Sequence, residues 1–444
     1  GPGVKEKASR VIAARGGALL PGLHDHHVHI VGLAGRAQSV WCGPPAVLDE
    51  GQLSRALENA PGSGWIRAIG YHESVLGYLP DASELDRLVA DRPLRMQHRS
   101  GRMWLLNSAA IGLLLATGDP PPGMEREGGC FTGRLFDADA WLRTALGSAP
   151  PDLSVISADL ARLGVTGLTD MTPQNGPQIS DHFTRQRKSG ALAQSLTIAG
   201  TLSLGDAVVE GWTLGPVKLH LHEADLPPFD EALTLIRAAH DNGRAVAIHC
   251  VSEVEIVFAL ALLDSAGAMR GDRIEHASIA TPDHVAQIAC MGLAVCVQPH
   301  FVAERGDRYL VDVEPRLQRD LYRLASLTDA GIALAGGSDA PFASHDPWAA
   351  MRAVVSRSTA AGEIIGPDEA LSPEQALSLW LADPADFGLR REIRVGAPAD
   401  LCLLDRPWAD ARMRLSGEDV VLTLASGEVV HDRVDQPPVE RPAR

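Results

Sequence analysis

Four histidines and an aspartate end an apolar run in the segment Leu19-Leu20-Pro21-Gly22-Leu23-His24-Asp25-His26-His27-Val28-His29-Ile30. Successive side chains of a β-strand point to opposite faces, so His27 and His29 share a face with Asp25 if this segment is a strand. His24 and His26 then point the other way, and we expect them to be structural. Two imidazoles on one face of a stiff strand form half of a metal site. A histidine-rich turn is the alternative, so the deciding ligands must come from elsewhere in the chain.

The 444-residue chain has an ordinary globular composition, with 45% hydrophobic and 22% charged residues. That length allows one large core together with a smaller second domain. The formal net charge is -16, whereas proteins that bind nucleic acid need clustered lysine and arginine. We therefore expect no nucleic-acid partner, and the charge says little else about the substrate. We also expect a small-molecule substrate, with a homodimer left open as the assembly state.

No apolar run approaches the roughly 20 residues that a membrane-spanning helix requires. The first residues lack the charged and apolar regions of a secretory signal, and Gly1-Pro2 resembles the remnant of a cleaved tag. Six cysteines without C-x-x-C spacing fit a reducing compartment. We expect a soluble, cytoplasmic protein that has no membrane partner.

From about residue 153 onward, strand-like and helical segments alternate. Strands are expected at 165–170, 196–200, 217–221, 245–249, 273–276, 294–298 and 332–336, with helices such as 230–242 between them. This alternation is typical of parallel β/α units with right-handed crossovers. The strand of the histidine segment makes eight, the number that closes a (β/α)8 TIM-like barrel. A doubly wound open sheet is the alternative, but the chain lacks its glycine-rich phosphate-binding motif.

Residues 40–150 interrupt this pattern after the first barrel strand. They contain Pro44-Pro45, Gly128-Gly129 and other proline and glycine pairs, with only short periodic segments between them. So many chain breakers indicate an insertion that folds over one face of the barrel, and we expect it on the active-site face.

Short strands at both ends of the chain predict a second, composite domain. Strands at 10–13 and 18–20 have no partner nearby, whereas 399–404, 420–424 and 429–430 read as strands near the other end. We therefore expect a small β-sandwich built from residues 4–20 and 386–435, with the barrel and its insertion over residues 21–385. Ser372-Pro373-Glu374 predicts a helix start just before the second part of that sandwich.

Titratable side chains stand at the carboxyl ends of the expected barrel strands, which converge on one mouth. They are His27, His29, Lys218, His249, His276 and Asp339. Each has an ordinary alternative, because a strand-end histidine is often structural and a lysine often reaches solvent. Burial of four imidazoles, an amine and a carboxylate at one mouth is unfavourable unless they share a ligand. The set therefore indicates a metal centre.

These motifs resemble the signatures of the metal-dependent amidohydrolase superfamily, and most closely its amidohydrolase-3, or YtcJ-like, branch. The segments that carry the likeness are Pro21-Gly22-Leu23-His24-Asp25-His26-His27-Val28-His29, Val217-Lys218-Leu219, Ala247-Ile248-His249, Arg273-Ile274-Glu275-His276-Ala277 and Gly337-Ser338-Asp339-Ala340-Pro341. Weaker matches, such as Val297-Gln298-Pro299 and Ala399-Asp400-Leu401, extend the likeness from about residue 10 to about residue 430, in family order.

The resemblance implies a metal-dependent hydrolase of a C–N bond in an amide, N-acyl or cyclic amide, with one or two Zn2+ ions or other divalent transition metals. By that likeness His27 and His29 bind one metal, and His249 and His276 bind a second. Lys218, if carboxylated, bridges both ions. Asp339 binds metal and acts as general base and acid. Donor chemistry agrees, because an amine ligates poorly unless it is deprotonated or converted to a carbamate. A mononuclear site remains open.

Five further residues are candidates for contact with substrate. They are Arg102, Trp104, His220, His222 and His300. Arg102 stands where the branch usually has a histidine, and a solvated surface residue is the alternative. His220 and His222 alternate onto the face of Lys218. Asp170, at the end of the second strand, is a candidate for orienting a ligand.

Three alternative functions remain open from the sequence. A deaminase of this superfamily usually has a glutamate three residues after the fifth-strand histidine, whereas Glu253 follows His249 by one residue more. Lactone or ester hydrolysis uses the same water and metal. A non-catalytic, metal-stabilised binding protein would need the ligands but no proton shuttle such as Asp339.

Overall fold

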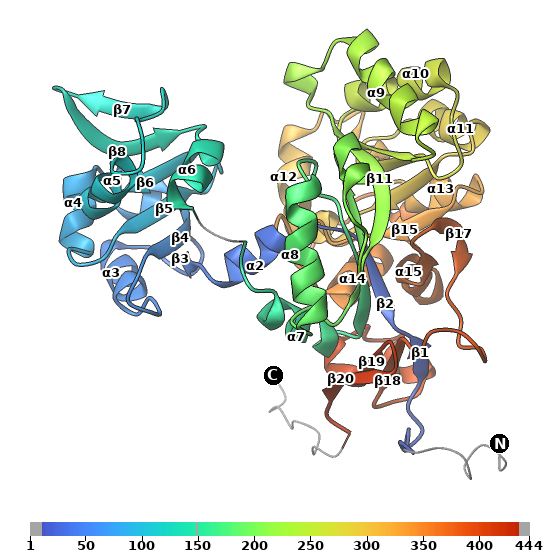
Figure 1. The fold of residues 1–444 in the computed structure, drawn as a ribbon. Coiled ribbons are helices and arrows are strands. Elements are labelled where there is room, and N and C mark those ends of the chain that lie inside the picture. The colour runs from blue at the N-terminus through green and yellow to red at the C-terminus, as the bar shows by residue number, and fades with distance from the viewer. Residues whose placement is uncertain (1–10, 148–149, 435–444) are drawn as a thin grey trace. The chain divides into compact units, whose positions relative to one another are not determined.

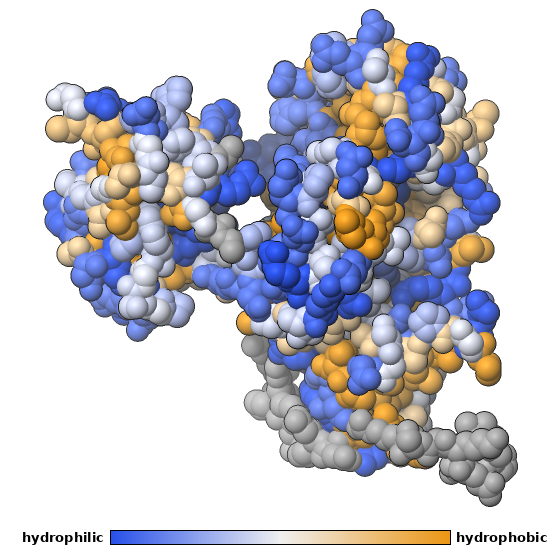
Figure 2. Space-filling view, in the orientation of Figure 1, coloured by the Kyte–Doolittle hydropathy of each residue, from blue (hydrophilic) through white to orange (hydrophobic). Residues whose placement is uncertain are grey.

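The computed structural model describes residues 11–147 and 150–434. They divide into two compact units, of which residues 11–33 and 152–434 form one and Ala34–Pro151 forms the other. No helix within the described ranges is both long and apolar enough to cross a lipid bilayer. Hydrophilic residues dominate the face drawn in Figure 2, with smaller hydrophobic groups between them, as is normal for a globular protein. The cytoplasmic location and the homodimer stay predictions.

Eight parallel strands form the central sheet of the first unit (Figure 1). In chain order they are β2 (Leu23–Val28), β9 (Val165–Asp170), β10 (Ser195–Gly200), β11 (Thr213–His220), β12 (Val246–Cys250), β13 (Arg273–His276), β14 (Ala294–Val297) and β15 (Leu334–Gly336). Each strand pairs with the next one along the chain, from β2 through to β15. Leu23, Ile248 and Val295 are fully buried, as expected for parallel strands that are covered on both faces.

Backbone hydrogen bonds bring the chain after β15 back to β2. The amide of Asp339 donates to the carbonyl of His27 at 2.6 Å, and that of His29 donates to the carbonyl of Ala340 at 2.8 Å. A Cβ at Gly337 would lie only 2.4 Å from Cβ of His27, so this approach requires glycine. The sheet is therefore a nearly closed barrel, which confirms the predicted (β/α)8 class and excludes the open doubly wound sheet.

Helices connect the barrel strands and surround them (Figure 1). They are α7 (Ser154–Arg162), α8 (Pro177–Lys188), α9 (Phe229–Asp241), α10 (Glu253–Ala266), α11 (Pro282–Cys290), α12 (His300–Asp312), α13 (Leu324–Asp329), α14 (Pro347–Ser356) and α15 (Pro373–Trp380). The helix α2 (Ile30–Ala37) instead follows β2 and includes the residue at which the second unit begins. Between β10 and β11 the connection carries the 3-10 turn η2 (Leu202–Asp206). Ser372 caps α15 and Pro373 opens it, which confirms the helix start predicted from Ser372-Pro373-Glu374.

Strands from both ends of the chain form a small antiparallel sheet. They are β1 (Leu19–Pro21), β18 (Leu401–Leu404), β19 (Val420–Ala425) and β20 (Glu428–Asp432), paired in that order. A separate hairpin joins β16 (Ala382–Asp383) to β17 (Asp386–Arg390), and the short helix α16 (Trp408–Ala411) follows β18. Residues 11–13 belong to no strand, contrary to expectation, and Arg10 lies outside the described residues. The proposed domain boundaries stay predictions.

The second unit has a sheet and a core of its own. Its elements are β3 (Val40–Trp41), α3 (Glu50–Glu58), β4 (Ile66–Tyr71), α4 (Ala82–Leu88), β5 (Leu94–His98), β6 (Met103–Leu106), α5 (Ser108–Leu115), β7 (Met124–Glu127), β8 (Cys130–Phe136) and α6 (Asp139–Leu146). The strand order is β3-β4-β5-β6-β8-β7. Leu53, Leu85 and Leu94 are fully buried in one core cluster. The insertion is thus a folded unit, and its predicted place over the active-site face stays a prediction.

Candidate metal centre

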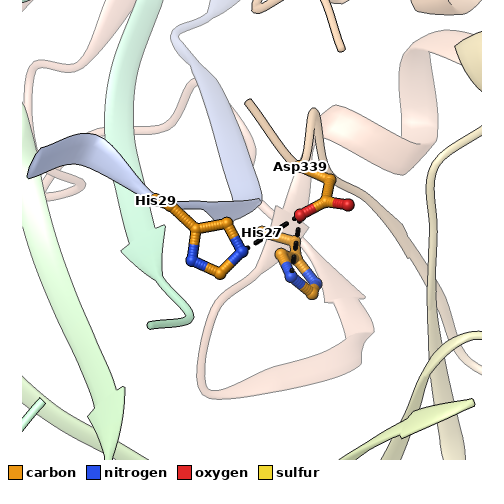
Figure 3. A group of neighbouring side chains, drawn as sticks. All are labelled: His27, His29 and Asp339. Atoms are coloured by element: carbon orange, nitrogen blue, oxygen red, sulfur yellow. Dashed lines mark hydrogen bonds and ion pairs between the residues drawn. The ribbon is translucent and has the colours of Figure 1, made fainter. Parts of the chain in front are cut away.

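His27, His29 and Asp339 converge at the carboxyl end of the barrel strands. His27 ends β2 with Val28, His29 follows that strand, and Asp339 follows β15. Figure 3 shows both rings and the carboxylate pointing toward one another. Oδ1 of Asp339 lies 3.1 Å from Nε2 of His29 and 3.4 Å from Nε2 of His27. One ligand atom from each of the three lies within 4.8 Å of the other two.

Glu275 orients the ring of His27 through a hydrogen bond to its Nδ1. Oε2 of Glu275 lies 2.6 Å from Nδ1 of His27, and Oε1 accepts a hydrogen bond of 2.6 Å from Nε of Arg273. Burial, together with the charge of Lys218, holds the pKa of His27 well below its usual range. The imidazole is therefore neutral, and with Nδ1 donating to the carboxylate its Nε2 is left as an electron-pair donor toward Asp339.

Thr172 has the corresponding role for His29. Oγ1 of Thr172 lies 3.0 Å from Nδ1 of His29. Asp170 fixes this part of the chain, because its Oδ1 accepts from the backbone amide of Thr172 and its Oδ2 from that of Ile30. Asp170, which we predicted to orient a ligand, thus contacts the backbone of the residue that touches His29.

Two further side chains hold the segment that carries Asp339. Oδ1 of Asp25 accepts hydrogen bonds from the amides of Ser338 at 2.9 Å and His27 at 3.1 Å. Burial raises the pKa of Asp25 to about 7, although these bonds oppose the shift. His300 is buried, and its Nε2 lies 2.6 Å from the carbonyl of Ser338. Asp25 and His300 therefore position Ser338, the residue before Asp339, through its amide and its carbonyl.

His249 and His276 complete the group of imidazoles. Their ring centroids are 4.4 Å apart, and the His276 ring lies 4.9 Å from that of His27. Burial lowers the pKa of both histidines, so both are neutral and able to bind metal. His276 and Asp339 have positive φ values of 72° and 50°. Left-handed backbone in two non-glycine residues is strained and is typical of functional sites.

Lys218 is buried among these groups without a hydrogen-bond partner for its Nζ. Both ring nitrogens of His276 also lack a hydrogen-bond partner within the described residues. Burial lowers the pKa of Lys218, and the carboxylates of Glu275 and Asp339 oppose that shift. Unpaired buried nitrogens are unfavourable unless a ligand satisfies them.

A cavity of about 430 Å3 contains these groups. The six predicted metal ligands all line it, together with His220, whose ring centroid lies 4.4 Å from that of His249. The barrel unit alone supplies this lining. The structure therefore brings together every residue of the predicted metal set, while their binding of metal stays a prediction.

The other predicted substrate contacts lie elsewhere. Arg102 belongs to the second unit, is mostly exposed and makes two hydrogen bonds to Asp137, at 2.9 and 2.7 Å. Trp104 is buried in a core cluster of that unit. His222 is exposed and caps the 3-10 turn η3 (Glu223–Asp225) by accepting from Ala224. None of these three lines the cavity, and their contact with substrate stays a prediction.

A second group of possible ligands, formed by His27, Glu275 and Cys296, is fully buried. Both oxygens of Glu275 are already engaged, by Nδ1 of His27 and Nε of Arg273. Burial also raises the pKa of Cys296 well above its usual value, which disfavours the thiolate that a metal requires. The group around Asp339 is therefore the better candidate.

The two remaining histidines of β2 are buried on its other side. Nε2 of His24 lies 2.9 Å from Oγ1 of Thr169. The ring of His26 meets that of Phe387 edge-on at 5.0 Å. Neither lines the cavity. Both ring nitrogens of His26 lack a hydrogen-bond partner among the described residues.

Sequence reasoning missed Glu275, Thr172 and one wall of the cavity. Glu275 directly precedes His276, and strand alternation predicts that neighbours point to opposite faces. The positive φ of His276 breaks this alternation, so both residues approach His27. The missed wall includes Phe301, Arg305 and Tyr309, whose spacing of four residues was the available signal.

Comparisons with known proteins agree with this geometry. A family model described as the amidohydrolase family matches residues 10–431. The chain is 26% identical to the N-substituted formamide deformylase of Arthrobacter pascens, over 96% of this chain and 90% of that protein. It is 24% identical to YtcJ of Bacillus subtilis (strain 168), over 95% of this chain and 90% of YtcJ.

The fold is also found among solved structures. An uncharacterized metal-dependent hydrolase from Pyrococcus furiosus matches with a TM-score of 0.74 and 22% identity, over 91% of each chain. Together with the family match, this confirms the resemblance that the motifs carry in the sequence. The chain belongs to the amidohydrolase family and is a hydrolase that acts on carbon–nitrogen bonds.

Proposed function

We propose that the chain hydrolyses an amide, N-acyl or cyclic amide bond at a divalent metal, with Asp339 as general base and acid. The observation that carries this proposal is the convergence of His27, His29 and Asp339 in one cavity, beside two more neutral imidazoles and a buried amine. One relative is named for the deformylation of N-substituted formamides, which are themselves amides. That name supports an amide as the substrate class.

The donors fit a divalent transition metal, and we propose Zn2+. Neutral imidazoles and carboxylates are the nitrogen and oxygen ligands that zinc takes in catalytic sites. The unpartnered nitrogens of Lys218 and His276 support a missing ligand at this place. We assign His27, His29, His249, His276, Lys218 and Asp339 to one or two ions. When bound, such an ion polarises the scissile carbonyl and lowers the pKa of water toward 7.

Asp339 is placed to move the proton. Its Oδ1 faces His27 and His29, while Oδ2 makes no hydrogen bond to any described residue. Burial raises the pKa of Asp339, but the hydrogen bond to His29 and the neighbouring basic side chains hold it below its usual value. The carboxylate is therefore ionised, so Oδ2 can accept a proton from the attacking water and return it to the leaving nitrogen.

Lys218 suits carboxylation. Its lowered pKa favours the neutral amine, which is the form that attacks carbon dioxide to give a carbamate and release one proton. The carbamate oxygens would replace an unpartnered Nζ with two ligand atoms in the middle of the imidazole group. We therefore propose a carboxylated Lys218 as a ligand of the metal centre.

The geometry favours hydrolysis of an amide over deamination. Glu253 does not line the cavity, and its Oε2 forms an ion pair with Nη2 of Arg316 at 3.8 Å. Glu255, two residues on, is engaged in capping α10 and accepts from the amides of Val251 and Glu223. Glu275 is the cross-strand partner of His249, but its two oxygens are engaged by His27 and Arg273. None of these glutamates is therefore free beside His249 for the acid role. Ester and lactone hydrolysis would use the same residues as amide hydrolysis.

The test is Asp339→Asn, assayed for hydrolysis of a panel of N-acyl and N-formyl amides and for bound metal. Loss of the proton acceptor should lower kcat by about 100- to 10,000-fold while the protein stays folded. Asp312→Asn, on the exposed end of α12, is the matched control and should keep full activity. Unchanged hydrolysis in Asp339→Asn would show that Asp339 is not the base.

A further inference from the structure

One wall of the cavity is apolar, in contrast to the metal end. It includes Phe301, Val313, Leu321 and Phe342, and the ring of Phe342 meets that of His29 edge-on at 5.4 Å. Phe342 is 60% exposed, so it stands at an accessible side of the cavity. Covering apolar surface beside the reacting centre contributes favourably to the free energy of ligand binding. The wall therefore favours a substrate with an aryl or branched alkyl group.

A single helix face supplies much of this wall. Phe301, Arg305 and Tyr309 follow one another at intervals of four residues on α12 and all line the cavity. Residues four apart lie on the same side of a helix. The helix thus places one cation between two aromatic rings.

Arg305 is an exposed residue in the cavity lining. Its guanidinium lies 4.3 Å from the centroid of the Phe301 ring, and its Nη2 donates to the carbonyl of Phe342 at 2.7 Å. Over residues 11–147 and 150–434, no carboxylate oxygen forms an ion pair with it within 4.0 Å. By contrast Arg308, one turn further along α12, is paired with Asp312. In a chain with a formal net charge of -16, an oriented and unpaired arginine in the cavity is a ready anion site.

Two tyrosine hydroxyls extend this polar patch. The hydroxyl of Tyr309 lies 3.1 Å from that of Tyr322, and Oγ of Ser278 donates to the Tyr322 hydroxyl at 3.2 Å. All three residues line the cavity. Two of the three hydroxyl hydrogens are used within this chain, which leaves one to donate to a ligand beside Arg305.

We propose that the substrate is an amide that carries an apolar aryl or branched alkyl group and, away from the scissile bond, a carboxylate, and that Arg305 binds this carboxylate. The inference rests on the proposed function for the position of the scissile bond. Binding of the carboxylate itself depends only on the residues of the wall.

Binding of two matched probes to the intact protein tests the assignment. Titration calorimetry compares 4-phenylbutanoate with 4-phenylbutan-1-ol, which shares the apolar part and lacks the charge. Wild type should bind the carboxylate more tightly. Arg305→Gln should weaken binding of the carboxylate by about 10- to 100-fold, the usual effect of losing a charge-assisted hydrogen bond, and should leave binding of the alcohol unchanged.

Arg308→Gln, on the same helix and outside the cavity lining, is the matched control and should change neither affinity. The proposal is overturned if wild type does not prefer the carboxylate, or if Arg305→Gln leaves its affinity within about twofold. It is also overturned if Arg305→Gln weakens binding of the alcohol as much as binding of the carboxylate, because Arg305 would then only shape the cavity wall. These results do not depend on catalysis, so Arg305-dependent binding in a protein that hydrolyses no amide would reject the proposed function alone.

Discussion

The Nδ1 atom of His27 lies 2.6 Å from Oε2 of Glu275, and the two side chains come from strands that are not neighbours in the sheet, β2 and β13. Glu275 is fully buried and is also bonded to Arg273. This pair fixes which nitrogen of His27 faces Asp339. In the proposed metal centre, Glu275 would therefore support a ligand without touching the metal or the substrate itself.

Glu275→Gln should lower metal affinity. Glutamine keeps the shape of the side chain but removes the charge that holds Nδ1 of His27 protonated. Loss of such a supporting carboxylate typically weakens metal binding by about 10- to 100-fold. Competition with a chromophoric chelator measures the affinity. Glu253→Gln, outside the cavity lining, should bind metal like wild type, and equal affinity in both variants would refute the role of Glu275.

Thr172→Val should have a smaller effect in the same direction. Valine matches threonine in shape and removes the oxygen that lies 3.0 Å from Nδ1 of His29. One such hydrogen bond is worth about 0.5–1.5 kcal/mol, so metal affinity should fall by about 2- to 10-fold. The matched control is Thr234→Val on the exposed side of α9, where Oγ1 bonds only the carbonyl of Asp230. A wild-type affinity in Thr172→Val would mean that His29 needs no such support.

Lys218→Ala should lose metal and activity together if its carbamate is a ligand. A short carboxylic acid such as propionate, added in excess, should restore part of both, because it can occupy the space of the missing carbamate. Protein equilibrated with 13C-labelled bicarbonate should also show a carbamate signal by NMR that the variant lacks. Lys188→Ala, an exposed residue paired with Glu210, should keep the signal. A variant that retains full metal content would exclude Lys218 as a ligand.

Stability should fall as the pH drops below about 6.5, in part because of His182. Burial of His182 in α8 lowers its pKa below the usual 6.5. Below pH 6.5 the unfolded chain binds a proton at this residue that the folded chain does not, so the free energy of unfolding decreases until the folded pKa is reached. Urea denaturation at pH 7.5 and 5.5 should show a smaller loss for His182→Gln than for wild type. An equal loss would show that His182 does not contribute.

The sequence was sufficient for the barrel because its strands are short, apolar and regularly spaced. The observed β13 runs from Arg273 to His276, as predicted, and the predicted helix 230–242 appears as Phe229–Asp241. The second unit was harder to predict. Its strands pair partly in antiparallel fashion, β6 with β5 and β8, and proline and glycine pairs concealed the periodicity.

The convergence of the candidate ligands could be predicted because the strand ends of a barrel lie together by topology. Lys218 and His249 therefore line one cavity although the chain separates them. The supporting residues could not be predicted in this way. Strand alternation puts Glu275 and His276 on opposite faces, and both lie near His27 because the positive φ of His276 breaks that alternation. Arg305 lies on a helix whose position over the mouth follows from packing, and that position is invisible in a single sequence.

Elemental analysis of protein purified without chelators tests the central claim most directly. Wild type should contain one to two equivalents of a divalent transition metal per chain, and the double variant His27→Asn/His29→Asn should contain less than about a tenth of that amount. The control His24→Asn, on the other side of β2, should keep its metal if it remains folded. Wild-type protein that contains no transition metal and does not bind added Zn2+ would contradict the assignment of this barrel mouth as a metal centre.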